Sequence, residues 1–460
     1  MDKNNYKAIV YPKREIIGDV IKFHAEIKFA EGYTIIKTIE APNDREYNPY
    51  DDAILIRAYP VLSILLKNGD KVYFEGTLSD GLLSTLRTAN EYYHECYNGL
   101  GELYHLIDVT AKKESPIKTP PLAKDAVLAY SAGVDANYAL LSQKKGLCSA
   151  KNVNIKTAIV LNNLEVLSSD TKFNNKKKIC DNVLAHFGVE QVNITLTDEV
   201  PGYIRYMWNL SSALYLFANT GNYSTALIGS GGGTQQGLWY GSDENNCIFT
   251  NVFASKALQV REEATNISRP KKCELLSTDA IIMKNLITCF KPDFKEKLNC
   301  GYCGKCVETI LCFWANGIYD IPSFPELDYK KFYKVLKKYI IECRAPDFIF
   351  YKQIVEETIN SERNKYWYLL VKKCVVRRRI KSLLDFYKIP FIYLVYRMKL
   401  LLSFTTSLQN KVFHKYVNCI QKIKDDNVNI EKSYDYFIGQ RGLIAQMKDE
   451  KEQAIKNSLK

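Results

Sequence analysis

The stretch that decides the fold is A-V-L-A-Y-S-A-G-V-D-A, residues 126–136. Its first five residues form a short apolar run of the kind found in a buried strand, and the small residues after them predict a tight turn. Residues 134–143 then show a helical pattern. We therefore predict a strand, a turn and a helix in direct succession.

The same alternation continues along the chain. Further elements are predicted, in chain order, at residues 157–161 (strand), 176–187 (helix), 192–196 (strand), 204–218 (helix) and 225–229 (strand). Strands that alternate with helices imply crossover connections and a parallel sheet covered by helices on both faces. Residues 120–320 are therefore predicted to form an α/β domain with a parallel sheet.

Regions of different character flank this domain. Residues 1–115 are predicted to form an N-terminal α+β domain, because β-prone runs are followed by one helical stretch. These elements are expected at residues 20–29, 33–39 and 71–75 (strands) and 82–96 (helix). The polar, proline-rich residues 112–121 are typical of a linker and mark the predicted boundary. Residues 325–460 are predicted to form a largely helical, basic C-terminal region.

The net charge of +12 is concentrated in that last region. Residues 325–460 hold about 28 Lys and Arg against about 15 Asp and Glu, a balance of about +13. Such a segment favours an acidic partner: nucleic acid, an anionic membrane surface or a protein. A solvated helical face explains the charge equally well.

Two stretches within the basic region indicate which kinds of partner are possible. Lys372, Lys373 and residues 377–379 lie among Tyr and Trp, a combination that suits nucleic-acid contact. Residues 386–404 are apolar with flanking basic side chains, so they could contact a membrane surface or a partner. A buried helix is the favoured explanation of this second stretch.

The N-terminal sequence predicts a cytoplasmic protein. Residues 1–5 lack the pattern of a secretion signal, and no run of about 18 uncharged apolar residues occurs, so no membrane-spanning segment is expected. The chain has thirteen cysteines. In a long chain without an export signal, reduced thiols and one metal site are the favoured interpretation of these cysteines.

The turn at residues 131–136 is suited to bind phosphate. Small side chains leave backbone N–H groups accessible, and the N-terminus of the following helix contributes a positive dipole end. The residues expected to contact the phosphates are Ser131, Ala132, Gly133, Val134, Asp135 and Ala136. Asp135 could hold Mg²⁺ against the phosphates or could cap the helix. The turn alone is a weak signal, since many strand-to-helix connections look similar.

A cysteine cluster predicts a zinc site. Cys300, Cys303 and Cys306 follow one another at intervals of three, and glycines between them allow tight turns that bring the sulfurs together. Cys289 is the nearest upstream candidate for the fourth ligand, with Cys273 and Cys312 behind it. Four thiolates would fill a tetrahedral Zn²⁺ sphere, so the site is predicted to be structural. The alternatives are free buried thiols and an iron–sulfur cluster.

Together these two features resemble the PP-loop ATP pyrophosphatase superfamily, in its QueC-like (7-cyano-7-deazaguanine synthase-like) branch. The family loop S-G-G-x-D-S is matched by S-A-G-V-D-A at 131–136, and the family zinc motif by the cysteines already named. The basic element before that motif is matched by S-R-P-K-K at 268–272. Residues 45–112 are similar to the N-terminal region of longer relatives, several of which are associated with surface-polysaccharide or defence gene sets.

The resemblance implies a Rossmann-like fold of the HUP type and an adenylating, AMP-forming enzyme. MgATP is expected over residues 131–136, and a substrate carboxylate or amide oxygen would attack its α-phosphorus. Ammonia or another amine would then displace AMP. Asp135, Arg269 and Lys272 are the expected catalytic residues, the two cations acting on the triphosphate; a solvated basic turn is the alternative for them. Residues 230–234 could shape the substrate pocket or form a plain loop.

The loop departs from the family pattern at two positions. Ala132 adds a methyl group where the family has glycine, and Ala136 lacks the hydroxyl of the family's serine. Loss of one hydrogen bond to a charged phosphate would cost about 1.5–3 kcal/mol of nucleotide interaction. The second hypothesis is therefore a catalytically degenerate nucleotide- or nucleic-acid-binding protein within a multi-protein, for example antiviral defence, system. A third is a scaffold whose C-terminal helices dock a partner or membrane surface.

Overall fold

The computed structural model describes most of the first 378 residues. The described ranges are 5–98, 104–119, 123–148, 152–164, 170–197, 206–231, 247–289, 297–342 and 345–378. They divide into two compact units, each considered by itself. The first unit lies within Met1–Cys300 and includes Ile321–Pro325. The second contains Gly301–Asp320 and the described residues from Glu326 onward.

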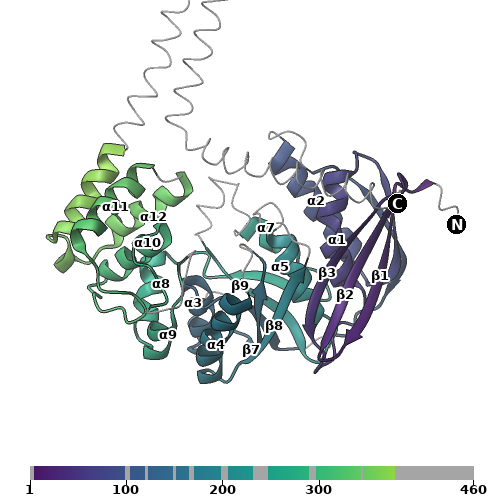
Figure 1. Ribbon diagram of the computed structural model, residues 1–460, viewed down its shortest axis with the longest axis horizontal. Coiled ribbons are helices and arrows are strands. Elements are labelled where there is room, and N and C mark those ends of the chain that lie inside the picture. The colour runs from purple at the N-terminus through teal and green to yellow at the C-terminus, as the bar shows by residue number, and fades with distance from the viewer. Residues whose placement is uncertain are drawn as a thin grey trace, which may run out of the picture. The chain divides into compact units, whose positions relative to one another are not determined.

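The first unit is an α/β structure built on one large, mostly parallel sheet (Figure 1). Within the described residues this sheet has ten strands, in the order β10-β9-β6-β7-β8-β3-β2-β1-β4-β5. The strands are β1 (Ala8–Ile17), β2 (Val20–Phe29), β3 (Thr34–Pro42), β4 (Lys71–Ser79), β5 (Asp108–Ser115), β6 (Asp125–Ala129), β7 (Asn154–Asn162), β8 (Glu190–Thr197), β9 (Tyr223–Gly229) and β10 (Gln259–Glu263).

Strands β6 to β10 form a wholly parallel half of the sheet. Their apolar residues are buried on both faces, as in β7, where Thr157–Asn162 are all buried. The helices that accompany these strands are α3 (Val134–Lys144), α4 (Asp170–His186), α5 (Tyr206–Leu214), η3 (Tyr215–Phe217), α7 (Cys247–Asn251), α8 (Arg269–Leu276) and α9 (Ala280–Asn285). The predicted alternation of strands and helices is thus confirmed.

The direction of the connections assigns the helices to opposite faces. The chain moves from β6 through β7 to β8 and then returns to β9 on the far side of β6. Right-handed crossovers therefore place α3 and α4 on one face and α5 on the other. The contacts agree, because α3 packs against α8 and α4 against α9, whereas α5 packs against α1 (Asp52–Leu65).

The N-terminal strands extend the same sheet. Strand β3 pairs antiparallel with β8, and β2, β1, β4 and β5 follow outward, with α1 and α2 (Leu82–Asn98) packed on them. The predicted boundary between residues 1–115 and 120–320 stays a prediction about independent folding, although the strands on both sides of it belong to one sheet and to the first compact unit. The predicted linker is wrong in part, because its first four residues complete β5.

The second unit is helical. Its elements are α10 (Gly304–Trp314), α11 (Tyr329–Glu342), α12 (Ala345–Glu357), η4 (Asn360–Glu362) and the helical residues 366–378. Trp314, Phe332 and Trp367 are buried, and the ring of Trp314 contacts the rings of both other residues. Residues 379–460, including the apolar stretch 386–404, lie outside the described residues. No helix within the described ranges is long and apolar enough to cross a membrane.

Candidate functional site

The turn between β6 and α3 is held in a defined conformation. Ala132 has a φ of 58°, which places it in the left-handed region that non-glycine residues rarely adopt. Its carbonyl oxygen accepts hydrogen bonds from Asn137 Nδ2 (2.9 Å) and from the backbone N–H of Ile287 (2.9 Å). Asn137 is itself fixed, because its Oδ1 accepts from the Tyr130 hydroxyl (2.6 Å). These contacts stabilise a turn that its own sequence disfavours.

The start of α3 leaves backbone donors at the turn. Gly133 is the N-cap residue, and the N–H of Asn137 donates to its carbonyl (3.0 Å). The amides that precede Asn137 in the first turn have no acceptor within the helix. Ser131 is exposed and its Oγ lies 3.4 Å from the Gly133 nitrogen. The turn therefore has the features of an anion-binding helix start.

The end of β9 lies directly against this helix start. A Cβ atom added at Gly229 would lie 2.3 Å from the carbonyl oxygen of Asp135, so only glycine fits there. Strand β9 pairs with β6, and their C-terminal ends lie side by side. As a result, the carbonyl groups of Ser230 and Gly231 lie beside the first turn of α3.

A buried charged cluster forms at this point. Arg269 Nη2 donates to Asp135 Oδ2 (2.8 Å) and to the Gly231 carbonyl (2.9 Å). Lys272 Nζ donates to Asp135 Oδ1 (3.0 Å) and to the Ser230 carbonyl (2.5 Å). Both cations come from α8, three residues apart and therefore on one side of the helix.

Burial strengthens the electrostatic interactions among the charged side chains of this cluster. The side chains of Arg269 and Lys272 are only 6% and 2% exposed, against 20% for Asp135. Taken together, the three side chains carry a net charge of +1. In a poorly solvated position, two cations beside a helix N-terminus favour the binding of an anion.

The structure thus brings together the three residues that the sequence placed in one site. It does not present Asp135 as an open metal ligand, because both carboxylate oxygens accept hydrogen bonds from cations. As they stand, these residues do not fit Mg²⁺. The remainder of the predicted pocket loop, residues 232–234, lies outside the described residues.

The four predicted zinc ligands do converge. The sulfur atoms of Cys289, Cys300, Cys303 and Cys306 all lie within 4.8 Å of one another. A tetrahedral ion with metal–sulfur bonds of about 2.3 Å would hold its sulfurs about 3.8 Å apart. The cluster could therefore bind a metal ion such as zinc. None of the cysteines whose side chains the structure describes takes part in a disulfide.

Asn299 shapes the backbone around these cysteines. Its side chain is buried, and its Oδ1 accepts from the backbone N–H groups of Thr288 (2.7 Å) and Cys289 (3.1 Å). Its Nδ2 donates to the Leu286 carbonyl (2.8 Å). Residues 286–289 also include Ile287, whose N–H donates to the turn at Ala132. One short segment thus connects the cysteine cluster with the β6–α3 turn.

Comparison with known proteins does not extend this description. No protein-family model, curated protein or solved structure matches the chain. The candidate site therefore has to be judged on its own geometry and chemistry.

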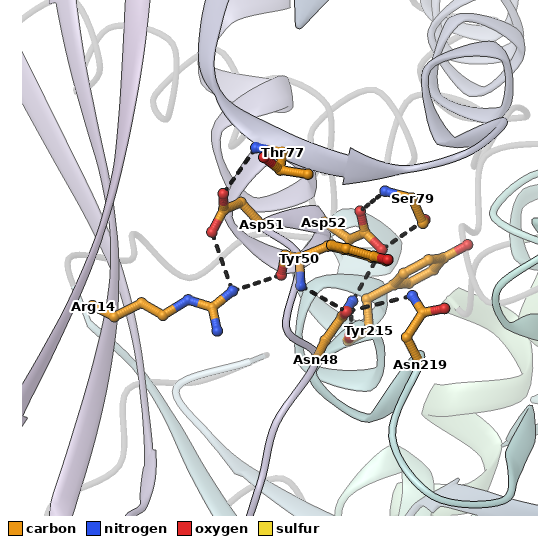
Figure 2. Close-up of polar contacts among 9 residues, drawn as sticks. All are labelled: Arg14, Asn48, Tyr50, Asp51, Asp52, Thr77, Ser79, Tyr215 and Asn219. Carbon is orange, nitrogen blue, oxygen red and sulfur yellow. Dashed lines mark hydrogen bonds and ion pairs between the residues drawn. The ribbon is translucent and has the colours of Figure 1, made fainter. Parts of the chain in front are cut away.

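A second polar cluster lies at the start of α1 (Figure 2). Asp52 is buried, and its carboxylate accepts from the Ser79 backbone N–H (2.8 Å), the Ser79 hydroxyl (2.7 Å) and Asn48 Nδ2 (3.0 Å). Burial raises the pKa of Asp52, although these hydrogen bonds oppose the shift. Asn48 Nδ2 also donates to the Tyr215 carbonyl (3.1 Å) and its Oδ1 accepts from Asn219 (3.4 Å).

The adjacent Asp51 completes this cluster. Its carboxylate accepts from the Thr77 backbone N–H (3.0 Å) and from Arg14 (3.1 Å). A Cβ at Gly76 would lie 2.8 Å from the Asp51 carboxylate, beside the irregular register of β4. Because the carboxylates are bonded to neighbouring elements, we assign the cluster a structural role: it fixes the start of α1 to β1 and β4 and, through Asn48, to η3.

Sequence reasoning missed several residues that build the site. Asn137 and Asn299 are ordinary polar residues in the sequence, and only their contacts identify them as supports. Gly229 carried a usable signal, since a glycine at the end of a predicted strand often marks a close backbone approach. Residues 230–234 were singled out as a possible pocket loop, but the contacts of the Ser230 and Gly231 carbonyl groups were not predicted, because main-chain acceptors are not encoded by residue type.

Proposed function

We propose that the protein is an ATP-dependent, AMP-forming enzyme of the QueC-like branch of the PP-loop superfamily. Its reaction would activate a carboxylate or amide for attack by ammonia or an amine. The observation that carries this proposal is the buried pair of cations Arg269 and Lys272, held at the β6–α3 turn by their contacts with Asp135. A triphosphate is the anion that such a pair of cations, placed beside a helix N-terminus, suits best.

The position of the site in the sheet supports this proposal. The connections from β6 and β9 leave in opposite directions along the sheet, with β7 and β8 on one side and β10 on the other. In open parallel sheets, ligands bind beyond the C-terminal ends of the strands where the order reverses. The strand order β10-β9-β6-β7-β8 has the pattern expected of a doubly wound sheet, with the turn at residues 131–136 at the reversal, and it supports the proposed Rossmann-like assignment.

The chain's own residues would act by binding and charge neutralisation. The turn amides would hold the terminal phosphates, and the cations would stabilise negative charge as pyrophosphate leaves. ATP supplies the leaving pyrophosphate and the adenylate that activates the substrate oxygen. Asp135 would then orient both cations rather than bind Mg²⁺, because its oxygens already accept from them. No step is assigned to the metal.

A metal ion at the cysteine cluster would have a supporting role. Four thiolates saturate a tetrahedral Zn²⁺ and leave no position for substrate. By holding Cys289 in place, the ion would also fix Ile287 and through it the carbonyl of Ala132. Zinc would therefore stabilise the turn rather than take part in the reaction.

Product analysis tests the proposed reaction. The full-length protein is incubated with ATP labelled at the α-phosphate, Mg²⁺, ammonia and a panel of carboxylic acids. Formation of AMP and pyrophosphate that depends on one acid supports the proposal. Release of ADP, or no AMP with any acid or amine, contradicts it.

A non-catalytic nucleotide-binding protein is the second candidate. It is favoured by Ala136, whose buried side chain offers no hydroxyl at the helix start, and by the left-handed conformation of Ala132. Such a protein would bind ATP at the same turn without forming AMP, so equilibrium binding combined with product analysis distinguishes the two.

A further inference from the structure

The second unit carries a concentration of positive charge that the proposed reaction does not use. Residues 329–341 contain five lysines and no acidic residue, and residues 363–378 contain six Lys and Arg and no acidic residue. The lysines of the first segment are all exposed: Lys330, Lys331, Lys334, Lys337 and Lys338. Two neighbouring segments of one sign produce a field that an anionic partner can sense.

The two segments lie side by side. The ring centroids of Tyr333 on α11 and Tyr366, at the start of the helical residues 366–378, are 5.0 Å apart. Further along, Arg378 Nη1 donates to the carbonyl of Ile340 at 2.9 Å. The second contact lies further along the chain than the first on both helices. The two helices therefore run alongside each other in the same direction. Their basic residues therefore contribute to one surface, about 20 Å long at 1.5 Å per residue.

The apolar side of α11 is already occupied. Phe332, Leu336 and Ile340 recur at intervals of four and are buried in the unit's core. The lysines consequently lie on the outer side of the helix. A helix that inserts into a lipid surface needs its apolar side free, so α11 does not meet this requirement.

Exposed aromatic rings accompany the charge. Tyr329 and Tyr366 are 55% and 60% exposed, and Tyr333 connects them through ring contacts of 6.0 and 5.0 Å. Exposed tyrosines beside lysines can stack on unpaired bases while the lysines contact phosphates. Acidic proteins would use the charge but have less need of these rings.

We propose that the surface formed by α11 and the helical residues 366–378 binds single-stranded nucleic acid. Phosphate contacts by the lysines and arginines supply most of the affinity, and stacking on the tyrosines distinguishes single strands from duplexes. The surface is independent of the β6–α3 turn, so this inference stands or fails separately from the proposed enzymatic function.

The test is equilibrium binding of a fluorescein-labelled 20-nucleotide thymidine strand to the full-length protein, by anisotropy across a salt series. The variant Lys330→Glu/Lys334→Glu/Lys337→Glu changes exposed side chains only. We expect at least a tenfold loss of affinity at 100 mM salt and a fall of about 2 in the salt slope. The matched control Lys67→Glu/Lys71→Glu/Lys113→Glu makes the same charge change at exposed positions of the first unit and should bind nearly as well as the unaltered protein.

A second variant separates stacking from charge. Tyr366→Ala should lower the affinity for the single strand by at least threefold. The salt slope, and the affinity for a duplex of equal length, should change little. The proposal is overturned if the unaltered protein binds no strand at 50 mM salt. It is also overturned if the triple variant of α11 and the triple control variant lose affinity equally. Flotation with anionic vesicles but no strand binding would likewise overturn it, by assigning the surface to lipid.

Discussion

Replacement of Lys272 by methionine tests the charged cluster most informatively. The change keeps the length of the side chain and removes its charge and its hydrogen bonds to Asp135 and the Ser230 carbonyl. Hydrogen bonds to charged groups contribute about 1.5–3 kcal/mol. The free energy of unfolding should fall by an amount in this range. The fall should stay below the 3–5 kcal/mol typical of a buried charge left without a partner, because Arg269 still pairs with Asp135.

The assay is urea unfolding followed by circular dichroism, with Lys271→Met as the matched control. Lys271 is the exposed neighbour on the same helix, so its replacement should change the free energy of unfolding by less than about 0.5 kcal/mol. In the double variant Asp135→Asn/Lys272→Met, the buried guanidinium of Arg269 also loses its ion pair with Asp135, so the free energy of unfolding should fall further than in Lys272→Met alone. Equal stability of the two single methionine variants would refute the reasoning, since it would mean that the buried contacts contribute nothing.

Three further predictions concern residues outside the charged pair of α8. Cys303→Ser should lower the zinc content measured by elemental analysis from about one ion per chain to near zero; unchanged zinc would rule out the cluster as the metal site. Gly229→Ala should destabilise the protein by about 1–3 kcal/mol in the same unfolding assay, because its methyl group would meet the Asp135 backbone, and an unchanged midpoint would contradict that close approach. Because burial raises the pKa of Asp52, the folded protein binds more protons than the unfolded chain, and its free energy of unfolding should fall as pH rises from about 3.9 through the raised folded pKa. Asp52→Asn should remove this part of the slope, and identical pH profiles of the two proteins would show that the carboxyl group is not perturbed.

Much of the sheet could be predicted from local sequence. The run at residues 20–29 coincides with β2, and strands β6 to β9 were found within three residues of their ends, whereas β10 was not predicted. These segments are short, strongly apolar or alternating, and bounded by turn residues, so their local pattern agrees with their tertiary role. The Val134 helix start was equally clear, because a small-residue turn precedes it.

Other elements could not be predicted for physical reasons. Helix α1 is buried on nearly every side and contains Pro60, so it shows no amphipathic period and includes a residue typical of helix breaks. The second half of β1 is exposed and includes three charged residues in succession. It therefore lacks the alternation of apolar and polar residues by which a strand is recognised. The final residues of β5 resemble a linker because they lie on an edge strand with polar side chains.

The candidate site shows the same division. Residues within a single turn, such as 131–136, could be selected from their local pattern. The contact of Asp135 with α8 spans 134 positions in the chain, so no periodicity encodes it. The resemblance to a known family pointed to Arg269 and Lys272, but it did not reveal that both are buried against the same carboxylate.

The most direct test of the central claim is a calorimetric titration of ATP into the unaltered protein, Lys272→Met and Lys271→Met. If the β6–α3 turn and its cations bind the triphosphate, the unaltered protein and Lys271→Met should bind ATP with equal affinity. Lys272→Met should bind at least about tenfold more weakly, as expected for 1.5 kcal/mol or more. Absence of ATP binding to the unaltered protein, or equal binding by all three, would contradict the account.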